Sequence, residues 1–531
     1  GNSLPVSAFT DYADGSTPSG SSAYEKRGIA VDIPIWQPDN CIQCNRCAYV
    51  CPHAAIRPVA MTAEETANAP EGIKTLPLTG MKDYTFTMTV SALDCTGCGS
   101  CANVCPGKKG NKALEMAPLE ANTEEQKFFD YGVTLPQKED VIAKYKETTV
   151  KGSQFKQPLL EFSGACAGCG ETPYAKLITQ LFGDRMYIAN ATGCSSIWGN
   201  SSPSTPYTVT PEGKGPAWSN SLFEDNAEFG YGMLLAQNTI RDRLKAKVEK
   251  IAEKTTDEAV KAAAAEYLET YTVGATNGTA TDKLVAALEA LDCDCEERTE
   301  VLKNKDFLAK KSQWIFGGDG WAYDIGYGGV DHVLASKKDI NIMVFDTEVY
   351  SNTGGQSSKA TKTGATAQFA AGGKETKKKD MASIAMSYGY VYVAQISMGA
   401  DFNQTVKAIA EAEAYPGPSL IIAYAPCINH GIKKGMSKAQ TEEQLAVECG
   451  YWNNFRYNPA AEGDKFSLDS KAPKAEGYQD FLNGEVRYNA LKRANPAKAD
   501  KLFALNEQEA MERYDYLNKL VTVYAAEKED K

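Results

Sequence analysis

Two short sequences between residues 314 and 356 decide the fold of this chain. The first reads Trp314-Ile315-Phe316-Gly317-Gly318-Asp319-Gly320-Trp321, and the second reads Ile340-Asn341-Ile342-Met343-Val344-Phe345-Asp346-Thr347-Glu348-Val349-Tyr350-Ser351-Asn352-Thr353-Gly354-Gly355. In each, an apolar run that is typical of a buried strand ends in polar residues and glycine. The two are separated by about one βαβ unit. We therefore expect two parallel strands whose carboxyl ends lie at one edge of an α/β sheet, where ligands bind.

The polar residues at these strand ends suit a magnesium-bound diphosphate. The Asp319 carboxylate, the Thr347 hydroxyl, Asn352 and nearby backbone carbonyls are hard oxygen ligands, which Mg²⁺ accepts together with phosphate oxygens. Glycine beside Asp319 lets the backbone approach a phosphate closely. The alternative is an ordinary glycine-rich turn, because short motifs recur by chance. The matched spacing of the second polar stretch favours the diphosphate site.

The two sequences together resemble the thiamine diphosphate motif. The part of the second from Asp346 to Gly355 is similar to the corresponding sequence of the pyruvate:ferredoxin oxidoreductases. The resemblance implies that Asp319, Thr347 and Val349 bind Mg²⁺ and that Asn352 acts in catalysis. The cofactor-binding residues that we expect are Glu171, Cys194, Gly318, Asp319, Gly320, Trp321, Thr347, Glu348, Val349, Tyr350, Ser351 and Asn352.

Composition sets broad limits on the function. The chain has 531 residues, a net charge of −12, 43% hydrophobic and 23% charged residues. These values fit a soluble globular protein of several domains and argue against general nucleic-acid binding. No apolar run approaches the ~20 residues that span a bilayer, and the start of the chain does not read as a signal peptide, so we expect a cytoplasmic protein. Fifteen cysteines then indicate metal ligation rather than disulfides.

The spacing of eight cysteines is the strongest signal in the sequence. Cys41-x2-Cys44-x2-Cys47-x3-Cys51-Pro52 recurs as Cys95-x2-Cys98-x2-Cys101-x3-Cys105-Pro106. This is the bacterial ferredoxin run, in which the fourth cysteine of each motif ligates the other cluster. We expect one [4Fe-4S] cluster on Cys41, Cys44, Cys47 and Cys105, and a second on Cys95, Cys98, Cys101 and Cys51. Paired zinc knuckles are the alternative, but zinc sites lack the shared triple-cysteine-plus-proline run.

A further Cys-x2-Cys pair occurs in Ala165-Cys166-Ala167-Gly168-Cys169-Gly170-Glu171. Cys194 follows a predicted strand over 186–191, and Cys427 follows another over 419–425. A zinc site is the alternative for such a pair. The family resemblance implies that Cys166, Cys169, Cys194 and Cys427 hold a third [4Fe-4S] cluster near the thiamine, with Glu171 beside it. From the residues alone, Glu171 is equally a first-turn carboxylate favoured by the helix dipole.

The fold class that we expect is α/β: a thiamine-binding parallel sheet with a small α+β two-cluster ferredoxin domain and an irregular, helical tail. The expected parts are 1–36 (linker or end of a preceding domain), 37–118 (ferredoxin-like), 119–160 (connector), 161–450 (thiamine domain with its own cluster) and 451–531 (tail on the main domain or a partner subunit). The thiamine part should include a loop over 200–232 and helices over 237–310 with a break at 272–281.

For two smaller groups of residues we predict no role in the chemistry. The basic run from Lys374 to Lys379 reads as a solvated face, with a docking site for an acidic ferredoxin as the weaker alternative. Cys293, Cys295 and Cys449 remain after the cluster ligands are assigned, and we expect them to be free thiols.

The resemblance implies the C-terminal portion of a pyruvate:ferredoxin oxidoreductase. Thiamine diphosphate with magnesium would decarboxylate pyruvate, coenzyme A would take the acetyl group, and three clusters would pass electrons singly to ferredoxin or flavodoxin. In this family the glutamate that activates thiamine lies in another domain, so missing N-terminal domains or another chain would supply it, and this chain alone should turn over poorly. A homodimer is expected, without nucleic acid or a membrane span.

The sequence leaves two alternative functions open. One is a related oxidoreductase for another 2-oxoacid, such as 2-oxoglutarate or an aryl pyruvate. The fused eight-cysteine domain favours pyruvate. The other is an electron-transfer protein with a vestigial thiamine fold, against which the intact Asp319, Thr347 and Asn352 argue.

Overall fold

The structure is a computed structural model that describes residues 3–293 and 295–526. The chain divides into two compact units. The first comprises residues 1–184, 194–216 and 426–443, and the second comprises 185–193, 217–425 and 444–531. Within the described residues, no helix combines the length and the apolar character needed to cross a membrane.

The first unit contains two small antiparallel sheets. β1 (Asp32–Trp36) pairs with β5 (Leu114–Pro118), and β4 (Thr85–Val90) lies between β2 (Ile56–Met61) and β3 (Leu76–Pro77). Buried Trp36, Phe86, Met88 and Leu114 pack between them. The other elements are the helices α1 (Arg46–Tyr49), α2 (Ala63–Ala67), α3 (Ser100–Val104), α4 (Glu125–Thr134), α5 (Glu139–Tyr145), α6 (Val150–Ser153), α7 (Thr172–Phe182) and α8 (Cys194–Ser196).

The second unit is built on an eight-stranded sheet, counted over the described residues, in the order β13-β12-β10-β11-β9-β8-β6-β7. All neighbours from β10 to β6 are parallel, as predicted. β7, which lies in the predicted loop, also pairs in parallel with β6, while β12 and β13 are antiparallel additions. The strands are β6 (Met186–Ala191), β7 (Ala217–Ser221), β8 (Ser312–Gly318), β9 (Ile340–Asp346), β10 (Tyr392–Ile396), β11 (Pro418–Tyr424), β12 (Phe455–Tyr457) and β13 (Phe466–Leu468).

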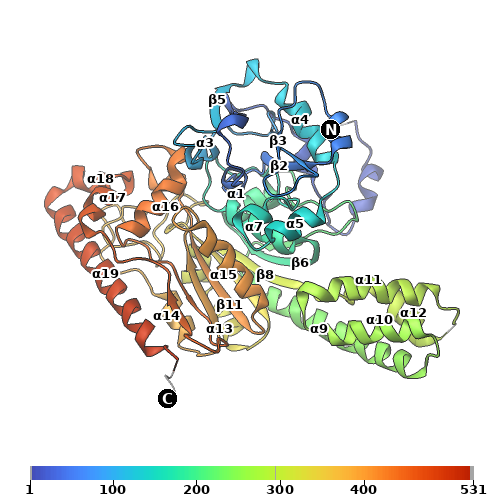
Figure 1. The fold of residues 1–531 in the computed structure, drawn as a ribbon. Helices are drawn as coiled ribbons and strands as arrows, with labels where there is room; N and C mark the ends of the chain where they lie inside the picture. Colours follow the sequence, from blue (N-terminus) through green and yellow to red (C-terminus); the bar gives the residue numbers. More distant parts are fainter. Residues whose placement is uncertain (1–2, 294, 527–531) are drawn as a thin grey trace, which may run out of the picture. The chain divides into compact units, whose positions relative to one another are not determined.

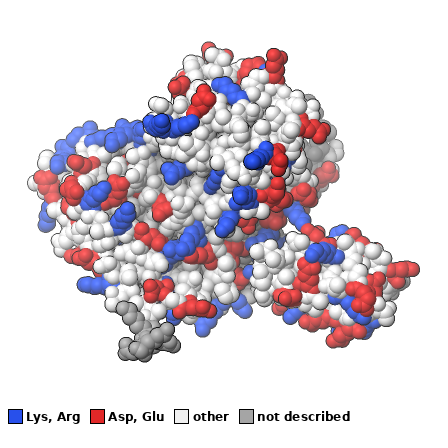
Figure 2. Space-filling model, viewed as in Figure 1, with Lys and Arg blue, Asp and Glu red and all other residues white. Residues whose placement is uncertain are grey.

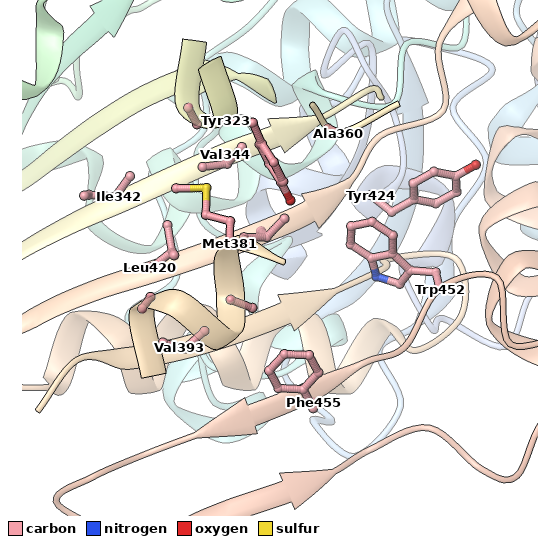
Figure 3. Packing of buried hydrophobic residues seen from close by; sticks show 14 of the residues in the cluster. Tyr323, Ile342, Val344, Ala360, Met381, Val393, Leu420, Tyr424, Trp452 and Phe455 are labelled. Atoms are coloured by element: carbon pink, nitrogen blue, oxygen red, sulfur yellow. The ribbon is translucent and has the colours of Figure 1, made fainter. Parts of the chain in front are cut away.

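The central strands are apolar throughout because both faces of the sheet are covered. Every residue of β9 and of β11 is buried. In Figure 3, Ile342 and Val344 of β9 lie beside Leu420 of β11, and Met381 packs over them. The helices beside the sheet are α13 (Tyr327–Ala335), α14 (Met381–Met386) and α15 (Phe402–Ala414), while α16 (Ala439–Glu448) spans the boundary between the units.

Four helices form an arm that extends from the sheet of the second unit (Figure 1). They pack around their own core, which includes Leu244, Val248 and Ile251, the residues of the predicted apolar stripe. Both signs of charge are mixed over the face of the arm shown in Figure 2. The four are α9 (Asn226–Lys254), α10 (Glu258–Glu269), α11 (Gly274–Ala290) and α12 (Glu296–Lys303).

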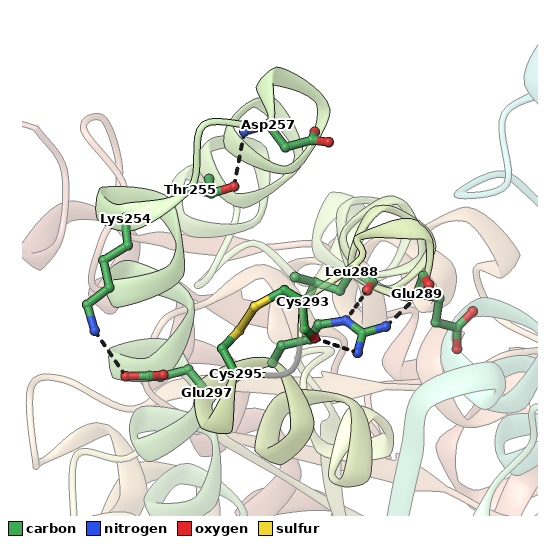
Figure 4. The surroundings of a disulfide bond; sticks show 9 residues. Lys254, Thr255, Asp257, Leu288, Glu289, Cys293, Cys295 and Glu297 are labelled. Carbon is green, nitrogen blue, oxygen red and sulfur yellow. Dashed lines mark hydrogen bonds and ion pairs between the residues drawn. A yellow bond between two sulfur atoms is a disulfide. The ribbon is translucent and has the colours of Figure 1, made fainter.

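Three local expectations are wrong. The predicted loop over 200–232 contains β7 and the first turns of α9, and the predicted break at 272–281 lies largely inside α11. Cys293 and Cys295 are joined by a disulfide between α11 and α12 rather than being free thiols (Figure 4). Cys449 is buried and does not take part in a disulfide, as expected.

The tail contributes to the core of the second unit. Its helices are α17 (Tyr478–Asn483), α18 (Val486–Ala494) and α19 (Pro496–Val523). Tyr478, Phe481, Tyr488, Phe503 and Leu517 are buried in the same hydrophobic cluster as Ile342 and Leu420 of the sheet. The tail also supplies β12 and β13, which are hydrogen-bonded strands at the edge beyond β10.

Candidate functional site

The parallel register brings the two polar sequences together at the ends of β8 and β9. Gly318 is aligned with Phe345, so Asp319 and Thr347 follow neighbouring strand ends. The Thr347 hydroxyl lies 3.0 Å from Asp319 Oδ1 and 3.0 Å from the Val349 carbonyl oxygen. The Thr347 backbone N–H also donates to Asp319 Oδ1, at 3.1 Å. Three oxygen atoms of the types that Mg²⁺ prefers are therefore gathered at one point.

The Asp319 carboxylate is fully buried at this point. Ser358 donates a hydrogen bond of 2.5 Å to Asp319 Oδ2. Burial and, after it, the neighbouring Asp346 together raise the pKa of Asp319 to about 8, against the opposing effect of the Ser358 hydrogen bond. A bound divalent cation reverses such a shift, because it favours the ionised carboxylate. The donor set and its burial thus fit the magnesium ion of a diphosphate site.

The glycines around Asp319 differ in what they accommodate. A Cβ atom on Gly317 would collide with the Trp321 ring, and one on Gly320 would collide with the Tyr350 ring. These two glycines make room for side chains of the protein itself. At Gly318 the nearest atom to a Cβ would be the Phe345 carbonyl oxygen, at 3.9 Å. Open space for a phosphate is therefore found at Gly318.

The remaining residues of the second sequence separate into a buried and an exposed part. Glu348 is fully buried, while Asn352 is exposed in a turn and forms no hydrogen bond with the described residues. Tyr350 is half-buried, and its N–H donates to the Gln356 carbonyl oxygen at 2.9 Å. The assignment of Asn352 as catalytic and of Ser351 and Tyr350 as thiamine contacts stays a prediction.

The Glu348 side chain binds charged residues of the protein. Its carboxylate lies 3.1 Å from Lys378 Nζ and 2.9 Å from Arg487 Nη1, and it accepts a hydrogen bond of 2.5 Å from the Tyr451 hydroxyl. Burial alone would raise the pKa of Glu348, but Lys378 and Arg487 hold it well below its usual range. A thiamine contact by Glu348 would therefore involve its backbone, and it stays a prediction.

Three lysines of the basic run over 374–379 bind carboxylates and carbonyl groups of the protein. Lys378 is paired with Asp346 at 2.7 Å as well as with Glu348, and Lys374 donates to the Ser358 and Thr361 carbonyl oxygens. Lys379 donates to the Tyr323 carbonyl oxygen at 3.1 Å. The expectation of a solvated face is wrong for these three lysines, because buried carboxylates need cationic partners and buried carbonyl groups need hydrogen-bond donors. Lys377 is exposed, as expected.

The eight ferredoxin-like cysteines form two groups of four within the first unit. One small cavity of about 20 Å³ is lined by Cys41, Cys44, Cys47 and Cys105, and another of about 20 Å³ is lined by Cys51, Cys95, Cys98 and Cys101. Each group takes three cysteines from one motif and the fourth from the other. The third cysteine of each motif lies in a short helix, Cys47 in α1 and Cys101 in α3.

The surroundings of these thiols fit metal ligation. Burial raises the pKa of Cys95 to about 12, with Cys51 and Cys98 adding to the rise, and it raises the pKa values of Cys47 and Cys101 well above the usual range. A thiol with a raised pKa becomes a thiolate through binding to a metal. Four such thiols around one small cavity match the donor set of an iron–sulfur cluster.

The third set of cysteines lies on three segments of the first unit. The Gly170 N–H donates to the Pro426 carbonyl oxygen at 3.1 Å, and the closeness of Gly168 and Gly170 to residues 426–436 leaves no space for a Cβ atom. Burial raises the pKa of Cys169 well above its usual range, and the Cys427 thiol adds to the rise. The assignment of Cys166, Cys169, Cys194 and Cys427 to one cluster stays a prediction, and so does the zinc alternative.

Glu171 joins two of these segments. It is 4% exposed and accepts a hydrogen bond of 2.8 Å from Trp198 Nε1, in the segment that begins with Cys194. Burial raises the pKa of Glu171 to about 7, although the Trp198 hydrogen bond opposes the rise. Glu171 is the N-cap residue of α7 but makes no side-chain capping hydrogen bond. A carboxylate at this position is also favoured by the helix dipole, and the role of Glu171 beside the thiamine stays a prediction.

Three family models match parts of the chain. Residues 40–109 match a 4Fe-4S dicluster domain, residues 304–423 match the C-terminal TPP-binding domain of thiamine pyrophosphate enzymes, and residues 1–30 match a domain of unknown function. The chain thus contains a 4Fe-4S domain and a thiamine-binding domain, as expected from the cysteine spacing and from the two strand-end sequences.

Curated relatives match almost the whole chain. A pyruvate-flavodoxin oxidoreductase of Enterobacter agglomerans is 56% identical over 98% of this chain and 45% of its own length. A pyruvate:ferredoxin oxidoreductase of Moorella thermoacetica is 56% identical over 98% of this chain and 44% of its own length. A solved 2-oxoglutarate:ferredoxin oxidoreductase from Magnetococcus marinus reaches a TM-score of only 0.29 at 16% identity, covering 50% of this chain and 65% of that chain.

The chain spans less than half the length of the curated relatives that it matches. Identity of 56% along nearly all of its residues nevertheless extends through both the cysteine-rich part and the thiamine-binding part. Along nearly all of its residues, the chain is therefore similar to a part of the pyruvate:ferredoxin and pyruvate-flavodoxin oxidoreductases.

Proposed function

We propose that this chain is the cofactor-bearing portion of an enzyme that oxidises pyruvate with coenzyme A and passes electrons singly to ferredoxin or flavodoxin. The observation that carries the proposal is the gathering of Asp319, Thr347 and Val349 at two parallel strand ends, in a chain with paired groups of cysteines. The names of the relatives, which specify pyruvate, support pyruvate as the substrate. A homodimer and a cytoplasmic location belong to the same proposal, on the family resemblance.

The residues at the strand ends would hold Mg²⁺ and, through it, the diphosphate. When bound, thiamine diphosphate supplies the chemistry that cleaves the bond to the pyruvate carboxylate. Asp319, the Thr347 hydroxyl and the Val349 carbonyl would be the protein ligands of the metal. The open space at Gly318 leaves room for a phosphate, and the exposed Asn352 is free of competing partners among the described residues.

Three [4Fe-4S] clusters would accept the electrons. Two would take the ferredoxin-like groups of four cysteines. The third would take Cys166, Cys169, Cys194 and Cys427, an assignment supported by the packing of residues 168–170 against residues 426–436. Clusters of this type reach potentials low enough for a strongly reducing donor.

An anaerobic assay of iron, acid-labile sulfide and thiamine diphosphate tests the cofactor content. Twelve irons per chain are expected from three cubanes, and eight irons with bound zinc would contradict the third cluster. Cys194→Ser should remove one cluster and leave the ferredoxin-like pair. Cys449→Ser is the matched control, because Cys449 is a buried thiol outside the three groups and outside any disulfide, and this variant should retain all of the iron.

The rate of pyruvate oxidation tests the proposed activity. The carboxylate that activates thiamine lies outside this sequence according to the family resemblance, so the isolated chain should bind the cofactors yet oxidise pyruvate slowly. A rate comparable to that of a full-length enzyme would contradict this view. On the complete enzyme, a panel of 2-oxoacids distinguishes pyruvate from 2-oxoglutarate as the preferred substrate.

A further inference from the structure

The turn that carries two of the proposed Mg²⁺ ligands has an unusual backbone. Glu348, between Thr347 and Val349, has φ of 59°, in the left-handed region that non-glycine residues adopt rarely and at a cost in energy. Such a conformation persists where surrounding contacts impose it. The Glu348 N–H donates to Asp346 Oδ1 at 3.1 Å, and the Thr361 hydroxyl donates to the Glu348 carbonyl oxygen.

The side chain of Glu348 is held from the C-terminal part of the chain. Arg487, in α18, forms an ion pair with Glu348 Oε2, and Tyr451 donates to the same oxygen. Arg487 Nη2 donates to the Tyr451 hydroxyl at 3.1 Å, and the Tyr451 and Tyr488 hydroxyls are 2.7 Å apart. All of these side chains are buried.

The charges around Glu348 are balanced. The buried carboxylates of Asp346, Glu348 and Glu485 are matched by Lys362, Lys378 and Arg487. The Arg487 carbonyl oxygen also accepts hydrogen bonds from the N–H and the hydroxyl of Thr366, at 2.8 and 2.7 Å. A buried charge network of this kind is rigid because moving one member leaves another unpaired.

We propose that Arg487 and Tyr451 are positioning residues for the proposed Mg²⁺ site: by holding the Glu348 carboxylate they fix the turn that presents the Thr347 hydroxyl and the Val349 carbonyl. This inference rests on the proposed thiamine diphosphate site. It gives the C-terminal tail a role in cofactor binding, although neither residue belongs to the strand-end sequences. A metal with near-ideal octahedral requirements is sensitive to small displacements of its ligands.

The test is Mg²⁺-dependent binding of thiamine diphosphate to the anaerobically purified chain, measured by isothermal titration calorimetry. Tyr451→Phe removes only the hydroxyl and should raise the Mg²⁺ concentration for half-saturation about tenfold. Arg487→Met should raise it further, and Arg487→Lys, which keeps the charge, should recover part of the loss. Arg493→Met is the matched control, because Arg493 is an exposed residue of the same helix, and it should bind as the wild type does.

The outcomes separate the inference from the function on which it rests. Absence of thiamine diphosphate binding by the wild-type chain would overturn the proposed function. Normal binding by folded Tyr451→Phe and Arg487→Lys variants, within twofold of wild type, would overturn the inference alone. Far-ultraviolet circular dichroism at the assay temperature shows which variants are folded. Should Arg487→Met fail to fold, the two conservative variants decide the question.

Discussion

The Arg487 guanidinium lies 2.9 Å from the Glu348 carboxylate, and both side chains are buried. Glu348 belongs to the turn after β9, whereas Arg487 belongs to α18 in the tail. The ion pair therefore joins the loop of the proposed metal site to the tail, for which the sequence predicted only an irregular, helical structure. A tail that supplies two strands and a buried arginine is part of the thiamine-binding unit rather than an appendage.

Thr347→Val tests the metal site directly. Valine keeps the branched shape of threonine but removes the hydroxyl that lies 3.0 Å from both Asp319 Oδ1 and the Val349 carbonyl oxygen. One hydrogen bond contributes about 1 kcal/mol, so the thermal midpoint should fall by no more than about 4 °C. The Mg²⁺ concentration that half-saturates thiamine diphosphate binding should rise at least about tenfold, because a metal ligand is lost.

The control for this change is Thr376→Val, at an exposed position outside the site. It should leave both the thermal midpoint and the Mg²⁺ dependence unchanged. Equal Mg²⁺ requirements for wild type and Thr347→Val, measured by titration calorimetry, would remove Thr347 from the ligand set.

Lys176 should influence the potentials of the ferredoxin-like clusters. This buried lysine of α7 donates to the Ala48 and Tyr49 carbonyl oxygens, in the segment between Cys47 and Cys51. Burial lowers the pKa of Lys176 to about 8, so the ammonium is largely charged at pH 7. A positive charge stabilises a reduced cluster, which is the more negative state. Lys176→Met should shift a one-electron equilibrium about tenfold, or ~59 mV, toward lower potential.

Dye-mediated redox titration at pH 7, followed by electron paramagnetic resonance, measures this shift. Lys176→Arg keeps the charge and should stay near the wild-type potentials. If Lys176→Met retains its full iron content and the reduction potentials of its clusters equal those of the wild type, Lys176 does not influence these potentials.

Lys362 should make stability depend on pH above neutrality. The side chain donates to the Tyr451 carbonyl oxygen, and burial lowers the pKa of Lys362 to about 8, although Glu348 opposes the shift. A lysine in the unfolded chain has a pKa of about 10.4. Between pH ~8 and ~10.4 the unfolded state therefore binds more protons, and this group makes the free energy of unfolding increase as pH rises.

The difference between wild type and Lys362→Met isolates that contribution. The thermal midpoints of the two proteins are measured at pH 7, 8, 9 and 10. The midpoint of the wild type should increase relative to that of the variant as pH rises. A constant difference between the two midpoints across this range would show that Lys362 has no depressed pKa in the folded protein.

The sequence was sufficient for most of the architecture because the relevant signals are local. The apolar runs over 186–191 and 340–345 predicted β6 and β9 almost to the residue, since buried parallel strands need continuous apolar sequence. The stripe of Leu244, Val248 and Ile251 predicted a helix with a buried face. The loop assigned to 200–232 failed because β7, Ala-Trp-Ser-Asn-Ser, has too few apolar residues to indicate a strand.

The sequence by itself determined which residues carry the chemistry. Asp319, Thr347 and the cysteine runs are recognisable because their residue types and spacings follow from ligand geometry. Only the tertiary structure decided what surrounds them. Lys378, Arg487 and Tyr451 meet Glu348 from distant parts of the chain, and no local pattern distinguishes a lysine that neutralises a buried carboxylate from one on a solvated face. Burial and pairing are properties of the packed chain, because they depend on contacts between segments that are remote in sequence.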